Sequence, residues 1–536
     1  MPTITISNFN LVCALLGGFA LVFGLVSYVI KERLYVSEAL PSLLFGVLVK
    51  ATDLIRPQDY NNGQPDGQEQ ITREFTRLVL GVQLVLAGVQ LPARYLRTEW
   101  VSMIMLLLPV MSAMWIISGL VIWLCIPNLR YLDALIIGAC ITPTDPVLSN
   151  SIVKGKFAEK HVAKSLRNMI SAESGANDGF GYPFLFLALD ILHHPNDQIA
   201  KSWILETIFY QVILSVAYGA VVGYVAMHAL HYARVKNMVD NESFLVFVFA
   251  LALFVVGTAG LFGTDDLLAC FIAGNAFTCD WFRIETEEDS FQAIMDFILN
   301  IAMFAWLGAV IGWSEFSTYE IPVWRFIVMA IAILIFRRLP IMLALYKFIP
   351  RIENFREAVF AGFFGPIGIG AVFYLHVLRE TMDRWSPSDE IKYTIKIASS
   401  VVYFLVVSSI IVHGITIPAV KLGPKLPQTL FRSLIQFRTS KINVTSMRTH
   451  TSNSIELDST NLRHRVVHIS GPINDRVGHE THLPTPASQS LPRSSSLTSS
   501  SSSSAIATRE GQSESDIVDI MDSKSSIEWT DAGRQV

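Results

Sequence analysis

Charged residues are scarce in this chain of 536 residues. Asp, Glu, Lys and Arg together make up 16% of it, whereas hydrophobic residues make up 51%. Soluble domains carry roughly 25% charged residues, so this composition excludes an ordinary soluble protein and indicates one that crosses a membrane several times. The formal net charge of −4 averages an apolar part and a polar part, and no nucleic-acid partner is expected.

Two other features are missing, a metal-binding cysteine pattern and a cleavable leader. The five cysteines are odd in number and have no metal-ligand spacing, so we interpret them as small buried hydrophobic residues and expect no cofactor. The first apolar run, residues 11–30, lacks a basic leading region and a small-residue cleavage site. We therefore expect a retained helix rather than a signal peptide.

Long apolar runs are abundant up to about residue 420. Because about 20 apolar residues cross a bilayer as a helix, these runs predict thirteen membrane-spanning helices and an all-α polytopic membrane domain over residues 1–420. The predicted segments are 11–30, 35–54, 73–92, 101–124, 131–153, 166–192, 203–229, 243–262, 265–280, 291–312, 321–345, 357–379 and 393–418.

Lys and Arg residues of the connecting loops predict the orientation of the chain. The loop 154–167 is the most basic and is expected in the cytoplasm, and the loops around 94–97, 234–236 and 347–356 fall on the same side if thirteen helices are counted. The loop 313–320 has no Lys or Arg, which suits the outside. The N-terminus is thus predicted outside and the C-terminal tail in the cytosol.

Beyond the last apolar run the chain changes character. Residues 421–441 form a basic juxtamembrane segment, which could lie as an amphipathic helix on the anionic inner leaflet or serve only as a basic stop after the last span. Residues 442–536 are polar and rich in serine, so we expect a disordered cytosolic tail. The Arg493–Ser496 stretch is a candidate phosphorylation site, and the tail is open to binding of regulatory proteins.

Acidic residues and prolines interrupt two of the predicted spans. Thr142–Pro146 reads Thr-Pro-Thr-Asp-Pro, and Ser171–Asp178 carries Glu173, Asn177 and Asp178. An Asp or Glu at the centre of a spanning helix costs about 2.5–3.5 kcal/mol to insert, and prolines leave backbone carbonyls that a cation can satisfy. Charge beside an interrupted helix indicates the ion site of a transporter.

The interrupted helices occupy corresponding positions in two halves of the chain. If predicted helices 1–6 and 8–13 are two repeats, the fifth, 131–153, corresponds to the twelfth, 357–379. The fifth contains Pro143 and Pro146, and the twelfth contains the glycine-rich stretch Gly362–Gly370. An offset of seven spans inverts the second repeat, and interrupted helices at matching positions of inverted repeats predict a substrate site near the bilayer midplane.

Asp178 has no Lys or Arg nearby in the sequence. A lone carboxylate in a low-dielectric environment tends to take up a proton. It can then alternate between holding the proton and holding a small cation, which is the minimal chemistry of an antiporter. Asn177 would add a carbonyl ligand or a neutral hydrogen-bond partner, and Thr144 and Ser174 would add hydroxyl oxygens. These hard oxygen ligands suit an alkali cation such as Na+.

The remaining acids leave alternatives open. Glu173 lies five residues before Asp178, which is about 140° away around a helix, so we predict a structural ion pair with Arg337 rather than ion binding. Asp145 could form a similar pair, neutralise helix-end dipoles, or bind the ion through its own carboxylate. The Asp265–Asp266 pair could be a favourable charge at a helix N-terminus or a cation-attracting entrance.

Four further polar residues lie in predicted spans. His376 and His413 are interpreted as core residues with satisfied hydrogen bonds rather than as proton relays. Gln83 and Gln90 are assigned to packing between helices, with a place beside the ion site as the alternative.

With these residues in view, the chain resembles the fungal plasma-membrane Na+/H+ antiporters of the monovalent cation/proton antiporter superfamily. The matching stretches run in the family's order through most of the membrane domain: ITPTDPVLSNSIVKGKFAEKHV (141–162), ISAESGANDGFGYPF (170–184), GTDDLLACFIAGNAF (263–277), FRRLP (336–340) and FFGPIGIGAVFY (363–374). The resemblance implies thirteen helices in two inverted repeats, a core domain with two crossed broken helices, a dimerising scaffold domain and a place in the plasma membrane.

The resemblance also implies roles for residues that already stand out by their chemistry. It places the family's ion site, structural ion pair and transport-related acids on these residues: Asn177, Asp178, Thr144, Asp145 and Ser174 for the ion; Glu173 and Arg337 for the pair; Asp265 and Asp266 for the acids. Na+ itself would be bound by Asp178, Thr144 and Ser174. Related prokaryotic antiporters carry an acid in the third helix, where this chain has only Gln83 and Gln90.

The sequence therefore predicts a secondary active transporter and not an enzyme. The expected reaction is exchange of cytosolic Na+ or Li+ for external protons by alternating access around Asp178, electroneutral because the site has one titratable acid, with roles in salt tolerance and pH homeostasis. Exchange of K+ or of several alkali cations is the alternative, since selectivity depends on sub-ångström differences in cavity size. An intramembrane aspartyl protease would need Tyr-Asp and Gly-x-Gly-Asp motifs, and the chain has neither. Expected partners are the lipid bilayer and a second copy of the chain.

Overall fold

The structure, a computed structural model, describes residues 8–28, 30, 36–53, 66–146, 148–149, 162–285, 291–317, 321–385 and 388–422. Regular structure within these ranges is entirely helical, as the apolar runs predict. Beyond Leu422, the juxtamembrane segment, the predicted tail and its candidate phosphorylation site lie outside the described residues.

Helices follow one another along the whole described part of the chain. In chain order they are α1 (Asn8–Tyr28), α2 (Ala39–Ala51), α3 (Asp66–Gln90), α4 (Tyr95–Thr98), α5 (Trp100–Met105), η3 (Leu106–Val110), α6 (Met111–Cys125), α7 (Tyr131–Cys140), α10 (Lys164–Gly179), α11 (Tyr182–His193), α12 (Asn196–Ser202), η4 (Trp203–Ile213), α13 (Leu214–Val235), α14 (Asn241–Phe262), α15 (Asp266–Phe277), α16 (Asp280–Glu285), α17 (Phe291–Val310), η5 (Trp313–Ser317), α18 (Val323–Phe336), α19 (Leu339–Leu345), η6 (Tyr346–Phe348), α20 (Phe355–Phe363), α21 (Ile369–Arg384) and α22 (Asp389–Leu422).

Each of the thirteen predicted segments overlaps at least one of these helices. Within the described residues, seven continuous helices are long and apolar enough to cross a membrane by length and composition. Other predicted spans are divided by breaks: the predicted helix 166–192 is α10 followed by α11, and 357–379 is α20 followed by α21. The breaks concentrate in the segments that carry the predicted ion site.

Small residues let neighbouring helices approach closely, as is usual in membranes. α2 and α17 cross at Gly46 and Gly308. A Cβ on Gly46 would collide with the carbonyl oxygen of Ala305, and one on Gly308 with that of Leu43. Because lipid is as apolar as a leucine side chain, such close backbone contact, rather than hydrophobic burial, stabilises the crossing.

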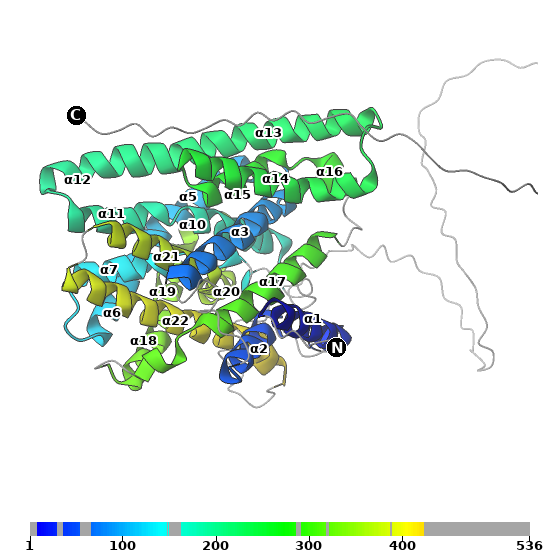
Figure 1. The fold of residues 1–536 in the computed structure, drawn as a ribbon. Helices are drawn as coiled ribbons and strands as arrows, with labels where there is room; N and C mark the ends of the chain where they lie inside the picture. The colour runs from blue at the N-terminus through cyan, green and yellow to red at the C-terminus, as the bar shows by residue number, and fades with distance from the viewer. Residues whose placement is uncertain are drawn as a thin grey trace, which may run out of the picture. The chain divides into compact units, whose positions relative to one another are not determined.

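The helices, labelled in Figure 1, can be described as two groups by their mutual contacts, and the groups also touch each other where α21 packs against α3. In the first group, α3 and α13 each pack against α14 and α15, and α17 packs against α2 and α3. In the second group, α6 packs against α7 and α18, α7 against α11, α21 and α22, and α19 against α20. α10 contacts α3 and α15 of the first group and α20 of the second. The helix that carries Asp178 therefore lies where the groups meet.

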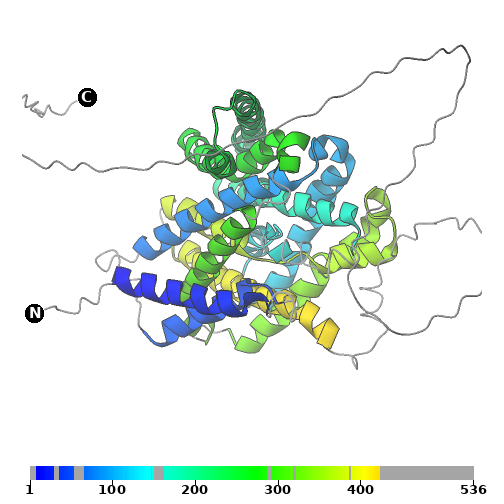
Figure 2. The ribbon, with the colours of Figure 1, turned by 90° about the vertical axis from the view of Figure 1, so that its right-hand side faces the viewer.

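α1 packs loosely compared with the other long helices. Figure 2 shows it, in dark blue, beside α17, and most of its apolar surface is exposed, as expected of a helix that faces lipid. Its Cys13 is exposed, whereas Cys140 and Cys270 are buried. The interpretation of all five cysteines as buried residues is thus wrong for Cys13, because an apolar environment in lipid does not require burial within the protein.

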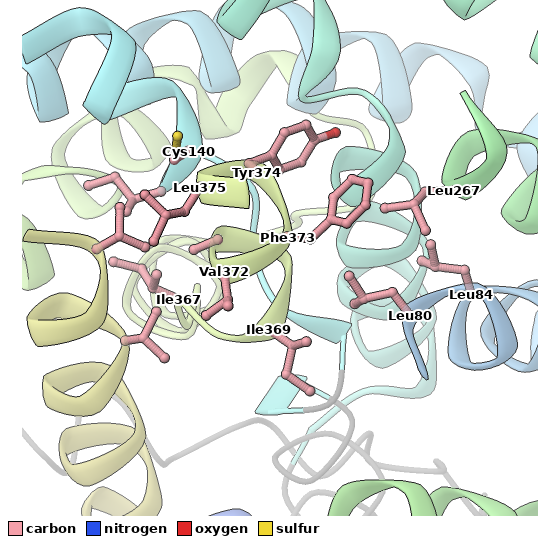
Figure 3. Close-up of a cluster of buried hydrophobic side chains, with 14 of the residues drawn as sticks. Leu80, Leu84, Cys140, Leu267, Ile367, Ile369, Val372, Phe373, Tyr374 and Leu375 are labelled. Carbon is pink, nitrogen blue, oxygen red and sulfur yellow. The ribbon is translucent and has the colours of Figure 1, made fainter. Parts of the chain in front are cut away.

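A buried hydrophobic cluster packs α21 of the second group against α3 and α15 of the first (Figure 3). Leu80 and Leu84 of α3, Leu267 of α15 and Cys140 of α7 meet the side chains of Ile369–Leu375 there. This cluster fixes the helix that begins directly after the second break.

Candidate functional site

Two interrupted stretches of backbone cross in the second group of helices. α7 ends at Cys140, and residues 141–145 continue without helix, while α20 ends at Phe363 and α21 begins only at Ile369. The Asp145 N–H donates to the carbonyl of Pro366 at 2.9 Å, so the two stretches touch backbone to backbone. The crossing that the matching interruptions predict is therefore present.

Asp145 caps two helix ends at this crossing. Its Oδ1 accepts the N–H of Ile369, the first residue of α21, at 2.9 Å, and its Oδ2 accepts the N–H of Leu148 beyond the first break at 2.8 Å. A carboxylate at these N-termini compensates their positive dipole ends. Gly368 makes the approach possible, since a Cβ there would collide with the carboxyl group. Among the alternatives for Asp145, this geometry favours neutralisation of helix ends.

Arg337 binds the C-terminal ends of α7 and α20, the half-helices that precede the two breaks. Its guanidinium donates to the carbonyl oxygens of Ile141 and Thr142 after α7 and to that of Gly365 after α20. These carbonyls lie at helix C-termini, where the dipole end is negative and a cation is favoured. Asp145 and Arg337 thus compensate the two polarities of the crossing.

The predicted ion pair between Glu173 and Arg337 is wrong in its choice of arginine. Glu173 accepts two hydrogen bonds from the neighbouring Arg338, at 2.5 and 2.7 Å, and both side chains are almost completely buried, at 2% and 3% exposure. Arg337 and Arg338 lie in the turn between α18 and α19, and their guanidinium groups bind different partners, backbone carbonyls for Arg337 and Glu173 for Arg338. The expectation that Glu173 is a structural residue stands, with Arg338 as its partner.

Asn177 ties α10 to the first break. Its side-chain oxygen accepts the N–H of Thr144 at 3.1 Å, and its amide nitrogen donates to the Thr144 hydroxyl at 2.8 Å. That hydroxyl lies 3.2 Å from the Ser174 hydroxyl, which in turn donates to Ser149 at 3.0 Å. The structure therefore brings together Thr144, Ser174 and Asn177 as predicted and adds Ser149, whose place in the apolar run after the break gave no signal.

Asp178 is fully buried, and neither of its carboxylate oxygens accepts a hydrogen bond from any described residue. The first turn of α21 lies directly against it, since a Cβ on Gly370 would come within 2.5 Å of Oδ1. An isolated buried carboxylate is strongly destabilised as an anion. This group therefore favours neutralisation, by a proton or by a bound cation.

Tyr374 holds the backbone that follows Asp178. Its hydroxyl donates to the Asp178 carbonyl at 2.6 Å and accepts the N–H of Gly181 at 3.1 Å, across the break between α10 and α11. Reasoning from the sequence overlooked Tyr374, although a tyrosine one turn after Gly370 on the broken twelfth helix was a usable signal.

The two acids at the start of α15 have different environments. Asp265 is the N-cap, and its Oδ1 accepts the N–H of Leu268 at 3.0 Å. Asp266 forms an ion pair of 2.5 Å with Arg77 of α3 and lines a cavity of about 320 Å³ beside Glu380 of α21. The helix-end interpretation describes Asp265, and the entrance interpretation remains open for Asp266.

The other polar residues of the spans make bonds between helices. Gln83 donates to Asn300 at 2.6 Å, and Gln90 donates to Gln292 at 3.1 Å, which agrees with their assignment to helix packing. His413 is buried and lies 3.2 Å from the carbonyl oxygen of Phe363. Both ring nitrogens of His413 face polar neighbours, whereas the side-chain oxygens of Gln83 and Gln90 accept no hydrogen bond from the described residues.

A family model, curated relatives and a solved structure all match this chain. Residues 18–422 match the family model described as sodium/hydrogen exchanger, transmembrane. The chain is 40% identical over 441 residues to a Na+/H+ antiporter of Saccharomyces cerevisiae, covering 78% of this chain and 44% of the relative. It is 41% identical over 457 residues to a probable Na+/H+ antiporter of Schizosaccharomyces pombe, covering 82% and 59%. The chain thus spans about half the length of these relatives.

A solved structure shows the same fold. The sodium proton antiporter MjNhaP1 of Methanocaldococcus jannaschii, solved at pH 8, superposes with a TM-score of 0.55 at 18% sequence identity. The superposition covers 78% of this chain and 99% of that one, so the shared fold includes most of the helices described above.

Proposed function

The chain belongs to the sodium/hydrogen exchanger family, and from this premise we propose that it exports cytosolic Na+ or Li+ in exchange for external protons at Asp178. The observation that carries the proposal is a fully buried carboxylate without a hydrogen-bond partner among the described residues, placed against a crossing of two broken helices. Fungal relatives named as Na+/H+ antiporters support this choice of ions.

Transport of the two ions is coupled because the site is energetically unfavourable when it holds neither of them. A buried anion is expensive, whereas a carboxylate neutralised by a proton or a monovalent cation is not. The protein can therefore switch between the inward-open and outward-open states when Asp178 carries either ion. It does not switch when the site is empty, because the carboxylate anion would then have to stay buried. Because Asp178 is the acid at the crossing whose two oxygens both lack a hydrogen bond from the described residues, one proton exchanges for one cation in this proposal, and the exchange is electroneutral.

The oxygen ligands that we propose for the cation beside Asp178 are hydroxyl groups of the first break and of α10. The hydroxyls of Thr144 and Ser174 belong to the network that Asn177 holds in place. Asp145 and Arg337 leave the crossing without net charge, so that the cation is attracted mainly by Asp178. Asn177 contributes orientation and no second titratable group.

Location and assembly belong to the same proposal. We place the protein in the plasma membrane with its N-terminus outside, as a dimer of two copies that meet through the first group of helices. The fungal relatives and the apolar outward faces of α1 and α13 support a place in lipid.

The test is Na+-dependent proton flux in vesicles that contain the purified full chain. Asp178→Asn should abolish the flux at every Na+ concentration while the protein stays folded, because an amide can neither release a proton nor carry the charge that binds Na+. Asp190→Asn is the matched control, since Asp190 is also a buried acid of a broken span but lies on α11 outside the crossing, and this variant should retain flux.

Measurements with Na+, Li+ and K+ in parallel decide the cation. Flux driven by K+ as strongly as by Na+ would replace the proposal with general alkali-cation exchange. Na+-dependent flux that persists in Asp178→Asn would remove Asp178 from the mechanism.

A further inference from the structure

The break between α20 and α21 is bridged by side chains of α22. In an unbroken helix the N–H of Ile367 would bond to the carbonyl of Phe363, four residues earlier. Here the Ile367 N–H donates to the Ser409 hydroxyl at 2.8 Å, and the Phe363 carbonyl oxygen lies 3.2 Å from Nε2 of His413. Ser409 and His413 are 0% and 4% exposed, and they stand one turn apart on α22.

The two side chains of the bridge contact each other as well as the two ends of the break. Nε2 of His413 lies 3.2 Å from the Phe363 carbonyl oxygen, and Nδ1 lies 3.0 Å from the carbonyl oxygen of Ser409. The Ser409 hydroxyl lies 3.2 Å from Nδ1. The Ser409 hydroxyl thus accepts from Ile367 on one side of the break, and the His413 ring contacts the Phe363 carbonyl on the other side. Two side chains replace one missing backbone hydrogen bond.

The residues that follow the bridge form one wall of the ion site. Two positions after Ile367, the N–H of Ile369 donates to Asp145 at 2.9 Å, and the next residue, Gly370, lies against Asp178. Figure 3 shows the side chains of Ile367 and Ile369 where the chain enters α21. Whatever determines the separation of Phe363 and Ile367 also determines how closely Gly370 approaches the carboxylate.

We propose that Ser409 and His413 form a clasp that sets the width of the second break and thereby tunes the cation affinity and the Na+/Li+ discrimination of the Asp178 site. The clasp rests on the proposed function, since it acts on the site of cation exchange. Both are positioning residues: they contact the backbone of the break and act on the ion through Ile369 and Gly370. Alkali cations differ in radius by tenths of an ångström, so a small change in cavity size alters selectivity.

The experiment measures apparent KM for NaCl and for LiCl in vesicles that contain the purified full chain. Ser409→Ala removes the hydroxyl, and His413→Leu keeps the bulk but removes both ring nitrogens. Each should raise KM for Na+ by about fivefold or more and change the ratio of the Na+ and Li+ values, because the break relaxes when one of its ends loses a contact. Ser409→Ala removes the hydroxyl that accepts the Ile367 N–H, and His413→Leu removes the ring contact of the Phe363 carbonyl, which keeps only the Gly365 N–H. His413→Gln, whose amide can both donate and accept, should restore both quantities to within about twofold of the unmodified chain.

Ser399→Ala is the matched control. Ser399 is a buried serine of the same helix, and its hydroxyl donates to the carbonyl of Ile395 one turn earlier, away from the break. This variant should keep the KM values and their ratio. If Ser409→Ala does not accumulate, Ser409→Cys, a weaker donor and acceptor, replaces it and should give an intermediate shift.

Two outcomes would overturn the clasp. One is that Ser409→Ala or His413→Leu lowers only thermal stability or maximal rate and leaves the KM values for Na+ and Li+, and their ratio, unchanged. The other is His413→Gln behaving like His413→Leu. Absence of Na+-driven proton flux in the unmodified chain would instead overturn the proposed function, so the two failures are distinguishable.

Discussion

At the scale of the residue, three buried acids in two short stretches have three different surroundings. Asp145 accepts hydrogen bonds from backbone N–H groups at two helix starts, Glu173 accepts two from Arg338, and Asp178 accepts none from the described residues. Only the last has a charge that its neighbours leave uncompensated. The difference in partners explains why one acid suits ion exchange and the other two suit architecture.

The Glu173–Arg338 pair gives a prediction on stability. Arg338→Met should lower the free energy of unfolding by about 3–5 kcal/mol, because it leaves a buried carboxylate unpaired. Combining it with Glu173→Leu should recover most of this loss, since both charges are then removed. Thermal unfolding of the purified protein in detergent measures both effects.

An exposed ion pair and the neighbouring arginine provide two controls for this stability prediction. Arg384 is 72% exposed and pairs with Glu380 on the same helix, so Arg384→Met should cost less than about 1 kcal/mol. Recovery when Glu173→Leu is combined with Arg337→Met, and not with Arg338→Met, would show that the pairing is misassigned.

At the scale of the element, the two broken helices work as one unit. Charges of opposite sign cap their opposite ends, and glycines allow the capping groups to come close. The first turn of α21 then closes over Asp178. A helix break is therefore a way to bring backbone dipoles and a carboxylate together without a second charged side chain in the ion site.

Gly370 gives a prediction at this scale. Gly370→Ala should raise the apparent KM for Na+ by at least about tenfold or abolish transport, because its Cβ would come within 2.5 Å of Asp178 Oδ1 and occupy space beside the ion. Proton flux in vesicles is the measurement. Gly257→Ala on α14, where a Cβ has nothing within 4 Å, should transport normally. Equal flux in the two variants would contradict the proposed place of the ion.

At the scale of the whole molecule, the helices form one group around the crossing and another against which it packs. Asp178 on α10 lies at their junction, next to α3 and α15. A site at such a junction can change its exposure when one group moves relative to the other. Neutralisation of Asp178 by a proton or a cation lowers the energy of this movement, because no uncompensated charge is then buried.

Electroneutrality gives a prediction at this scale. Displacing one net charge through 60 mV is worth about 1.4 kcal/mol, or roughly tenfold in equilibrium. Exchange of one proton for one Na+ should therefore proceed at the same rate whether the vesicle potential is held at zero or inside-negative. A strong dependence on potential, measured with the potential clamped by a K+ gradient and an ionophore, would require a second charge per cycle.

The membrane class, the apolar segments and the two interruptions could all be predicted from the sequence, because run length, charge and proline are local properties. Asp178 could also be singled out, since a lone acid in an apolar span is visible without coordinates. Glu173 could be separated from it by helical spacing alone.

Only the tertiary structure decided which groups meet across the chain. The choice of Arg338 over Arg337 depends on how the two side chains leave the turn between α18 and α19, and the role of Asp145 depends on α21, more than 200 residues away in sequence. The contacts of Tyr374, of Ser149 and of the Ser409–His413 bridge likewise join residues that are far apart in the sequence. Local chemistry determines which residues need a partner, whereas the direction of each side chain after a break determines which partner it finds.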